Sequence, residues 1–127
     1  MSGVARVVEI VFDCRQAPVV ARFWAAVLND YEVRPYDEAE IERLAALGLT
    51  PDTDPIVIVD GPGPRLCFQQ VDEPKHTKNR VHLDVEAADR QAEVDRLVQL
   101  GASVHQETPR WTTMLDPEGN EFCVLGP

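Results

Sequence analysis

Two pairs of chemically capable side chains occupy matching places in the two halves of this 127-residue chain. Glu9 and His82 each stand in an early stretch of alternating apolar residues, and Cys67 and Cys123 each stand in a later one. A carboxylate beside an imidazole makes an acid–base couple, because each group shifts the pKa of the other. With two thiols the same groups can bind zinc, since thiolates favour that ion. Equally, Glu9–His82 can be a structural pair, and a strand cysteine is often a small buried hydrophobe.

The spacing of these residues indicates an internal duplication. Cys67 follows Glu9 by 58 positions, and Cys123 follows His82 by 41 positions. The two intervals differ by 17, which is the length of the segment 37–53. That segment reads as a short helix followed by a loop. We interpret it as an insert in the first half that borders the cleft and can act as a lid.

Each half reads as a strand, a helix and three further strands. The first strands, 5–14 and 80–86, alternate with period two, and each is followed by a helix with an apolar stripe. The stripes are Val20, Phe23, Trp24, Val27 and Leu28 in the first half and Val94, Leu97 and Val98 in the second. We predict a single α+β domain over 1–127. It holds two βαβββ modules, about 5–70 and about 80–126, with helices on the outer face and sheets curling around a shared cleft.

Strand alternation predicts which side chains face that cleft. Phe122 and Val124 should face the helix of their module, which leaves Cys123 and Leu125 on the other side. The predicted cleft residues are Val7, Glu9, Val11, Cys67, Gln69, His82, Asp84, Trp111, Cys123 and Leu125. The basic run KHTKNR (75–80) reads either as an anion-binding group or as a solvated join between the modules, and we favour the solvated join.

Composition excludes several classes of partner. The formal net charge of −10 argues against nucleic acid, whose phosphates need Lys and Arg, and against anionic membrane surfaces. No apolar run approaches the roughly 18–20 residues of a membrane span. Three widely spaced cysteines suggest reduced thiols, so we predict a cytoplasmic protein. The acidity would steer a cationic ligand favourably, although solubility alone also explains it.

Four segments carry a resemblance to a known family. FWAAVL, GPRLCFQQV, KNRVHLDV and DPEGNEFCVL resemble the glyoxalase-like domain proteins common in actinobacteria. These belong to the vicinal oxygen chelate superfamily, also called the glyoxalase/bleomycin resistance/dioxygenase superfamily. The resemblance implies the duplicated βαβββ fold and a homodimer, often with a cleft built from both chains. That scaffold hosts isomerases, lyases, dioxygenases, thiol transferases and drug-binding proteins.

The resemblance also implies positions for a metal. In metal-dependent members, four positions supply His and Glu to a divalent ion, and here they correspond to Glu9, Cys67, His82 and Cys123. His82 matches the family's ligand, and Glu9 is an acceptable one. Cys67 and Cys123 depart from the pattern, most clearly at Cys123, where a glutamate is usual. We therefore expect no obligatory cofactor; if zinc, iron, nickel or manganese binds, these four residues are the expected ligands.

The leading functional interpretation is a binding protein of the glyoxalase/bleomycin resistance type. It would hold a small organic molecule, such as a natural product or an antibiotic, between apolar walls with a few polar anchors. Whether it is an enzyme stays open. The first alternative is a divalent-metal-dependent lyase or isomerase acting on a substrate with neighbouring oxygens. The second is a metal-free enzyme with Glu9 as general base and His82 as acid.

Overall fold

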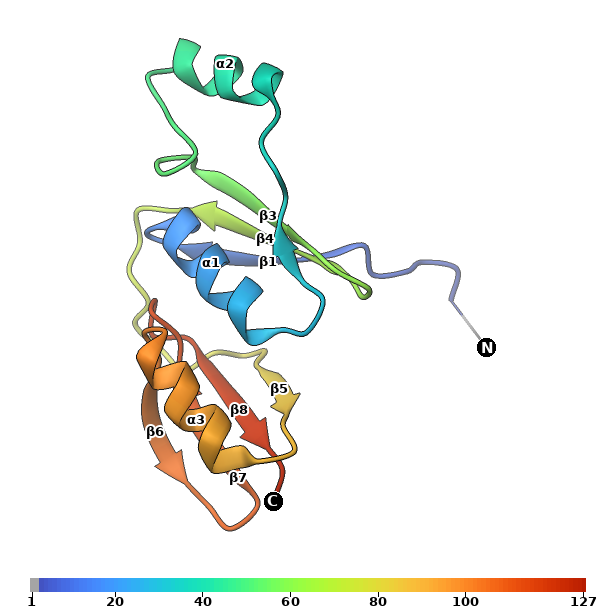
Figure 1. Ribbon diagram of the computed structural model, residues 1–127, viewed down its shortest axis with the longest axis vertical. Coiled ribbons are helices and arrows are strands. Elements are labelled where there is room, and N and C mark those ends of the chain that lie inside the picture. The colour runs from blue at the N-terminus through green and yellow to red at the C-terminus, as the bar shows by residue number, and fades with distance from the viewer. Residues whose placement is uncertain (1–2) are drawn as a thin grey trace.

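The computed structural model describes residues 3–127 and contains two four-stranded sheets (Figure 1). The elements of module one are β1 (Glu9–Cys14), α1 (Ala17–Val27), β2 (Glu32–Val33), α2 (Glu38–Ala46), β3 (Ile56–Asp60) and β4 (Arg65–Gln70). Those of module two are β5 (Leu83–Glu86), α3 (Arg90–Gln99), β6 (Ser103–Glu107), β7 (Trp111–Leu115) and β8 (Glu121–Leu125). The α+β fold of two βαβββ modules is confirmed. None of the helices within residues 3–127 is long and apolar enough to cross a membrane.

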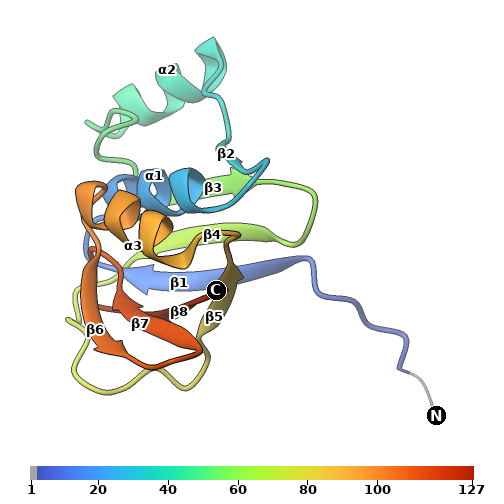
Figure 2. The ribbon, with the colours of Figure 1, turned by 60° about the horizontal axis from the view of Figure 1, so that its bottom comes forward.

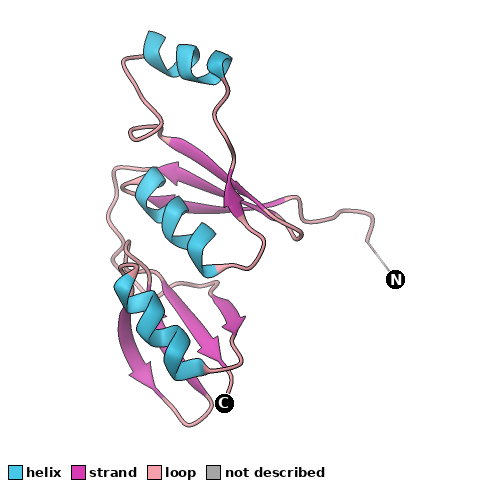
Figure 3. Cartoon of the chain, viewed as in Figure 1, coloured by secondary structure: helices cyan, strands magenta, loops and turns pink. Residues whose placement is uncertain are grey.

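The two sheets repeat one topology. Their strand orders are β1-β4-β3-β2 and β5-β8-β7-β6, with β1 parallel to β4 and β5 parallel to β8. Cys67 on β4 lies opposite Val11, and Cys123 on β8 lies opposite Asp84. The two cysteines therefore hold equivalent places in their sheets. In both modules the helix after the first strand covers one face of the sheet (Figure 3).

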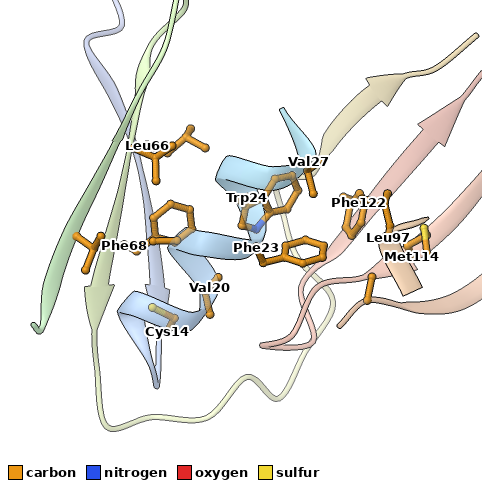
Figure 4. Packing of buried hydrophobic residues seen from close by; sticks show 14 of the residues in the cluster. Cys14, Val20, Phe23, Trp24, Val27, Leu66, Phe68, Leu97, Met114 and Phe122 are labelled. Atoms are coloured by element: carbon orange, nitrogen blue, oxygen red, sulfur yellow. The ribbon is translucent and has the colours of Figure 1, made fainter. Parts of the chain in front are cut away.

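Helix α1 carries the residues that join the two modules. Pro18 stands in its first turn, where a missing N–H costs nothing. Phe23 and Trp24 are buried on its apolar stripe, and their ring centroids lie 6.0 and 5.0 Å from that of Phe122 on β8. Edge-to-face aromatic contacts of this kind add stability beyond the area they bury. One hydrophobic core therefore extends from module one into module two (Figure 4).

The DPEGN turn before β8 reinforces this junction. Asp116 is only 4% exposed, and its Oδ2 accepts a hydrogen bond of 2.9 Å from the indole Nε1–H of Trp24. Its Oδ1 accepts the backbone N–H groups of Glu118 and Asn120, at 2.8 and 2.9 Å. Glu118 in turn accepts the backbone N–H of Arg15 at 2.7 Å. A turn of module two is thus bonded to the helix and the first loop of module one.

Three details differ from the sequence prediction. The strand expected over 80–86 begins only at Leu83, so Val81 is 75% exposed instead of facing the helix. Before Leu83, the backbone N–H of Asn79 donates a hydrogen bond to the side chain of Glu121, and this segment does not extend the sheet.

The second difference is the place of the insert helix α2. It lies at the end of the molecule away from the second sheet (Figure 1), so it does not border a cleft there as a lid.

The third difference concerns β6, where a β-bulge interrupts the pairing with β7. The register shifts between Val104 and Gln106, which leaves His105 without a partner in the ladder. A bulge sends successive side chains to the same side of a strand. Strict alternation, which would put His105 and Gln106 on opposite faces, therefore fails here, because both residues line the same cavity.

Candidate functional site

A cavity of about 660 Å³ opens on the face of the second sheet that α3 leaves bare. Its walls come from module two and from the linker, residues 71–79, which runs along this side of the sheet (Figure 2). The lining that matters for chemistry consists of Lys75, His82, Asp84, Trp111, Cys123 and Leu125. Five of the ten predicted cleft residues are therefore gathered here: His82, Asp84, Trp111, Cys123 and Leu125.

Cys123 forms part of the cavity floor. Its neighbours Phe122 and Val124 are fully buried against the core, so the alternation of β8 turns Cys123 and Leu125 toward the cavity. The Cys123 side chain is 9% exposed, and its Sγ lies 3.5 Å from the Thr113 hydroxyl on β7. The place of a usual carboxylate ligand is thus taken by a small, largely buried thiol.

Three potential ligand atoms converge beside this floor. His82 Nε2 lies 3.3 Å from Asp84 Oδ1, and one ligand atom from each of His82, Asp84 and Cys123 lies within 4.8 Å of the others. An imidazole, a carboxylate and a thiol form a chemically acceptable donor set for zinc. Of the four ligands that the resemblance implies, this group contains His82 and Cys123.

Glu9 has a different partner from the one expected. Its Oε1 accepts a hydrogen bond of 2.8 Å from Arg65 Nε, the residue opposite it on β4. Across residues 3–127, no ion pair connects Glu9 with His82, whose own partner is Asp84. An acid–base couple of Glu9 and His82 is therefore not assembled within one chain.

The other candidates of module one lie outside the main cavity. Val7 and Val11 are 68% and 48% exposed, while Cys67 is 6% exposed and Gln69 is exposed. Val11 does meet His82 in a second cavity of about 270 Å³, where β1 faces residues 79–83. The equivalent surface of module one is therefore open, with Val11 and Ile56 exposed beside the Glu9–Arg65 ion pair.

The linker is the part of the site for which the sequence analysis favoured a solvated join over an anion-binding group. Lys75, His76, Thr77 and Lys78 all line the main cavity. The run KHTKNR is therefore not simply a solvated join. A signal was available in the sequence, because Lys75 and Lys78 are its two lysines and stand within four positions.

Glu121, the first residue of β8, holds the linker in place. Its Oε1 accepts a hydrogen bond from Lys75 Nζ at 2.8 Å, and its Oε2 accepts one from the Asn79 backbone N–H at 2.7 Å. Burial alone would raise the pKa of this carboxyl group, but the hydrogen bonds from Lys75 and Asn79 outweigh burial and lower the pKa to about 2. The carboxylate therefore stays charged over the whole range in which proteins are normally handled.

Loss of this carboxylate is expected to release the linker. In Glu121→Gln, amide hydrogen exchange of residues 71–79 should quicken by about tenfold at pH 7, because charge-assisted hydrogen bonds are lost. In the parent protein, the stabilisation of the linker by the charged Glu121 is complete above pH 4.5, the ordinary pKa of a glutamate. It should fade only as the pH falls toward 2, the lowered pKa of this group. Hydrogen exchange followed by mass spectrometry measures both effects. Glu40→Gln on α2 is the control, and equal exchange in the two variants would show that Glu121 does not restrain the linker.

The three thiols are expected to react in a fixed order. Cys123 lines the cavity and should be alkylated by iodoacetamide first. Burial first, and then the charge of Glu9, raise the pKa of Cys67, which disfavours its reactive thiolate. Burial and the nearby carboxylates of Glu118 and Asp116 raise the pKa of Cys14 to about 12. Peptide mapping after timed labelling of the native protein should find the order Cys123, Cys67, Cys14, and initial labelling at Cys14 would contradict the structure.

Comparison with known proteins agrees with this architecture. The family model described as "Glyoxalase-like domain" matches residues 9–125. A search of curated proteins by sequence gave no match. Among solved structures, the fosfomycin resistance protein FosX from Mesorhizobium loti is similar, with a TM-score of 0.64, 13% identity and coverage of 98% of this chain and 91% of that chain.

Two further structures share the fold. A glyoxalase/bleomycin resistance protein/dioxygenase family enzyme from Burkholderia phytofirmans has a TM-score of 0.62 and 16% identity, covering 96% of this chain and 98% of its own. The trypanothione-dependent glyoxalase I of Leishmania major has a TM-score of 0.62 and 18% identity, covering 96% of this chain and 86% of its own. Identities this low establish the fold alone. The family match over residues 9–125 shows that this chain belongs to the glyoxalase-like domain family.

Proposed function

We propose that the protein binds a small organic molecule, such as a natural product or an antibiotic, in the cavity of module two, without an obligatory metal. The observation that carries this proposal is the cavity itself. Its volume of about 660 Å³ falls in the range that suits drug-sized ligands. Trp111 and Leu125 supply apolar surface, and His82 and Asp84 supply a few convergent polar groups. Sequestration of this kind requires no chemical step.

A thermal-shift screen tests the proposal. A ligand that binds only the folded protein raises the melting temperature, and the stabilisation grows with the logarithm of its concentration over its Kd. Hydrophobic natural products should include compounds that stabilise the protein. A bulky substitution of the floor residue Thr113 to Phe should remove that stabilisation, whereas Ile58→Phe, at the equivalent place in module one, should not. Failure of a diverse collection to stabilise the protein would oppose a binding function.

A metal-dependent lyase or isomerase is the second candidate. The convergence of His82, Asp84 and Cys123 supports it, because these donors suit a divalent ion and three protein ligands leave a position open. An ion held there would polarise a substrate oxygen. In that case His82 and Asp84 would fix the ion from one edge of the cavity and Cys123 from its floor. Glu9 and Cys67 would not be ligands from the same chain.

Metal content distinguishes the two candidates. Protein purified without chelators or nickel resin should contain well below one equivalent of zinc, iron, nickel or manganese if it is a metal-free binder. About one equivalent per chain, absent from His82→Ala and from Asp84→Ala, would support the enzyme instead. Within one chain Glu9 is paired with Arg65 and lies outside the cavity, so Glu9→Gln should leave the metal content unchanged, and a loss of metal would indicate a ligand from a second chain.

We also propose that the protein acts as a homodimer in the cytoplasm. The face of module one opposite α1 exposes Val11 and Ile56, which are 48% and 53% accessible. A second copy placed there would cover this apolar surface and could bring a Glu9 to a cavity, completing the metal-free acid–base couple. Light scattering should give twice the mass of the chain, and Ile56→Arg should shift the distribution to monomer. A monomeric parent protein would exclude a composite cleft.

A further inference from the structure

The cationic side chains of this protein are distributed in an unusual way. The chain contains two lysines, Lys75 and Lys78, and three histidines, His76, His82 and His105. All five line the same cavity. The ten arginines of the chain lie outside this lining, whereas its lysines and histidines are all gathered in it. The charge of the whole protein would favour a cationic ligand, whereas in the cavity the two lysines balance the two carboxylates, Asp84 and Glu121.

The two carboxylates of the cavity are already occupied. Both oxygens of Glu121 accept hydrogen bonds, from Lys75 Nζ and from the Asn79 backbone. Asp84 faces His82 Nε2 at 3.3 Å. In the structure of residues 3–127, Lys78 makes no ion pair or side-chain hydrogen bond, although it lines the cavity. Within residues 3–127, Lys78 is therefore the one charged group of the lining that is left without a partner.

Half of the ten arginines of this protein are paired with carboxylates. Five arginines form ion pairs with acidic residues outside the cavity, namely Arg22–Asp52, Arg34–Asp60, Arg43–Glu40, Arg65–Glu9 and Arg96–Glu93. Lys78 differs from these arginines because no carboxylate compensates it. Trp111, which lines the same cavity, is 38% exposed and presents an indole surface to it. A ring stacked on such a surface is stabilised by both area and geometry.

We propose that the cavity selects small aromatic anions, with the ring against Trp111 and Leu125 and a carboxylate bound by Lys78, Lys75 and His76. This inference rests on the proposed binding function and specifies the ligand class. An ammonium–carboxylate contact is charge-assisted and stronger than its neutral counterpart. The linker then has a defined role. Glu121 fixes Lys75 and the segment that carries Lys78, so that the cationic groups stand over the cavity before a ligand arrives.

Three probes with the same ring separate charge from shape. They are 2-naphthoate, 2-naphthamide and 2-naphthylmethylamine, which are anionic, neutral and cationic at pH 7. Isothermal titration calorimetry on the full chain should find 2-naphthoate bound about tenfold more tightly than 2-naphthamide, with the amine weakest. Raising the salt concentration should weaken naphthoate binding and leave the amide unchanged.

Two substitutions of Lys78 and one remote control locate the effect. Lys78→Gln should weaken naphthoate binding by about fivefold and leave naphthamide binding unaltered, since one partly exposed charge pair is worth up to about 1 kcal/mol. Lys78→Arg should restore most of the affinity. Arg43→Gln on α2 removes the same charge far from the cavity, so it controls for net charge.

The possible results separate this inference from the binding function. Naphthamide binding as tightly as naphthoate, or equal losses for both probes in Lys78→Gln, would overturn the anion selectivity while leaving small-molecule binding intact. Equal weakening by Arg43→Gln would assign the effect to overall charge and also overturn the inference. If neither the three probes nor any compound of the thermal-shift collection binds, the binding function and the inference fail together.

Discussion

Asp116→Ala is expected to lower the free energy of unfolding by about 3–5 kcal/mol, because it leaves buried donors without partners. The carboxylate is 4% exposed and accepts the indole N–H of Trp24, itself 1% exposed, together with the backbone N–H groups of Glu118 and Asn120. Because Trp24 is buried, water cannot readily reach its indole N–H and replace the lost carboxylate as hydrogen-bond acceptor. Urea denaturation monitored by circular dichroism measures the loss, as a lower midpoint with an unchanged slope.

Two further variants identify the source of this effect. Asp52→Ala removes a carboxylate that is 77% exposed and paired with Arg22 on the surface, so it should change stability by less than about 1 kcal/mol. Trp24→Phe keeps an aromatic ring but removes the N–H, and its effect should not add fully to that of Asp116→Ala. Full additivity of these two substitutions would show that the hydrogen bond between them contributes nothing.

Trp111→Ala is expected to weaken the binding of 2-naphthoate by about 30-fold, because aromatic anchors at a binding site typically contribute about 2 kcal/mol or more. The side chain is 38% exposed and stands at the end of β7, so its removal should change the free energy of unfolding little. Titration calorimetry gives the affinity, and a thermal melt of the same sample confirms that the variant remains folded.

Ile56→Ala is the matched control, because Ile56 holds in module one the place that Trp111 holds in module two. Ile56 lies opposite Gln69, two residues beyond Cys67, just as Trp111 lies opposite Leu125, two residues beyond Cys123. Unchanged affinity in Ile56→Ala would mean that module two binds the ligand by itself. A loss comparable to that of Trp111→Ala would mean that a second chain closes the cavity. Unchanged 2-naphthoate affinity in Trp111→Ala would contradict the placement of the binding site in this cavity.

The sequence predicts the fold well because burial governs it. Phe68 and Phe122 are fully buried, and their packing determines the faces of β4 and β8. The equivalence of Cys67 and Cys123 follows from that alternation. The sequence-based prediction fails where residues do not alternate regularly between a buried face and an open face. The bulge at His105 and the late start of β5 are local departures from regular pairing, which a period-two rule cannot anticipate.

The linker illustrates a different limit. Lys75 and Asn79 are held by Glu121, which follows them by 46 and 42 positions. No local periodicity encodes a polar contact of that range, so the basic run resembles any solvated connection when only its neighbours are considered. Glu9 shows the same limit. Its pairing with Arg65 depends on the parallel register of β1 and β4, which bring together residues 56 positions apart.

The linker has no counterpart in the repeat, and this gives the duplication a chemical meaning. Two fused copies of a βαβββ unit need only one connection between them. The linker that lies over the second sheet and is hydrogen-bonded to Glu121 is that connection, so the first sheet has no such segment. Without it, module two would offer the same bare sheet face as module one, where Val11 and Ile56 face outward. The cavity is therefore a product of joining the halves, and a circular permutant that is cut in the linker and joined between its natural ends would keep the eight strands and lose the covering segment.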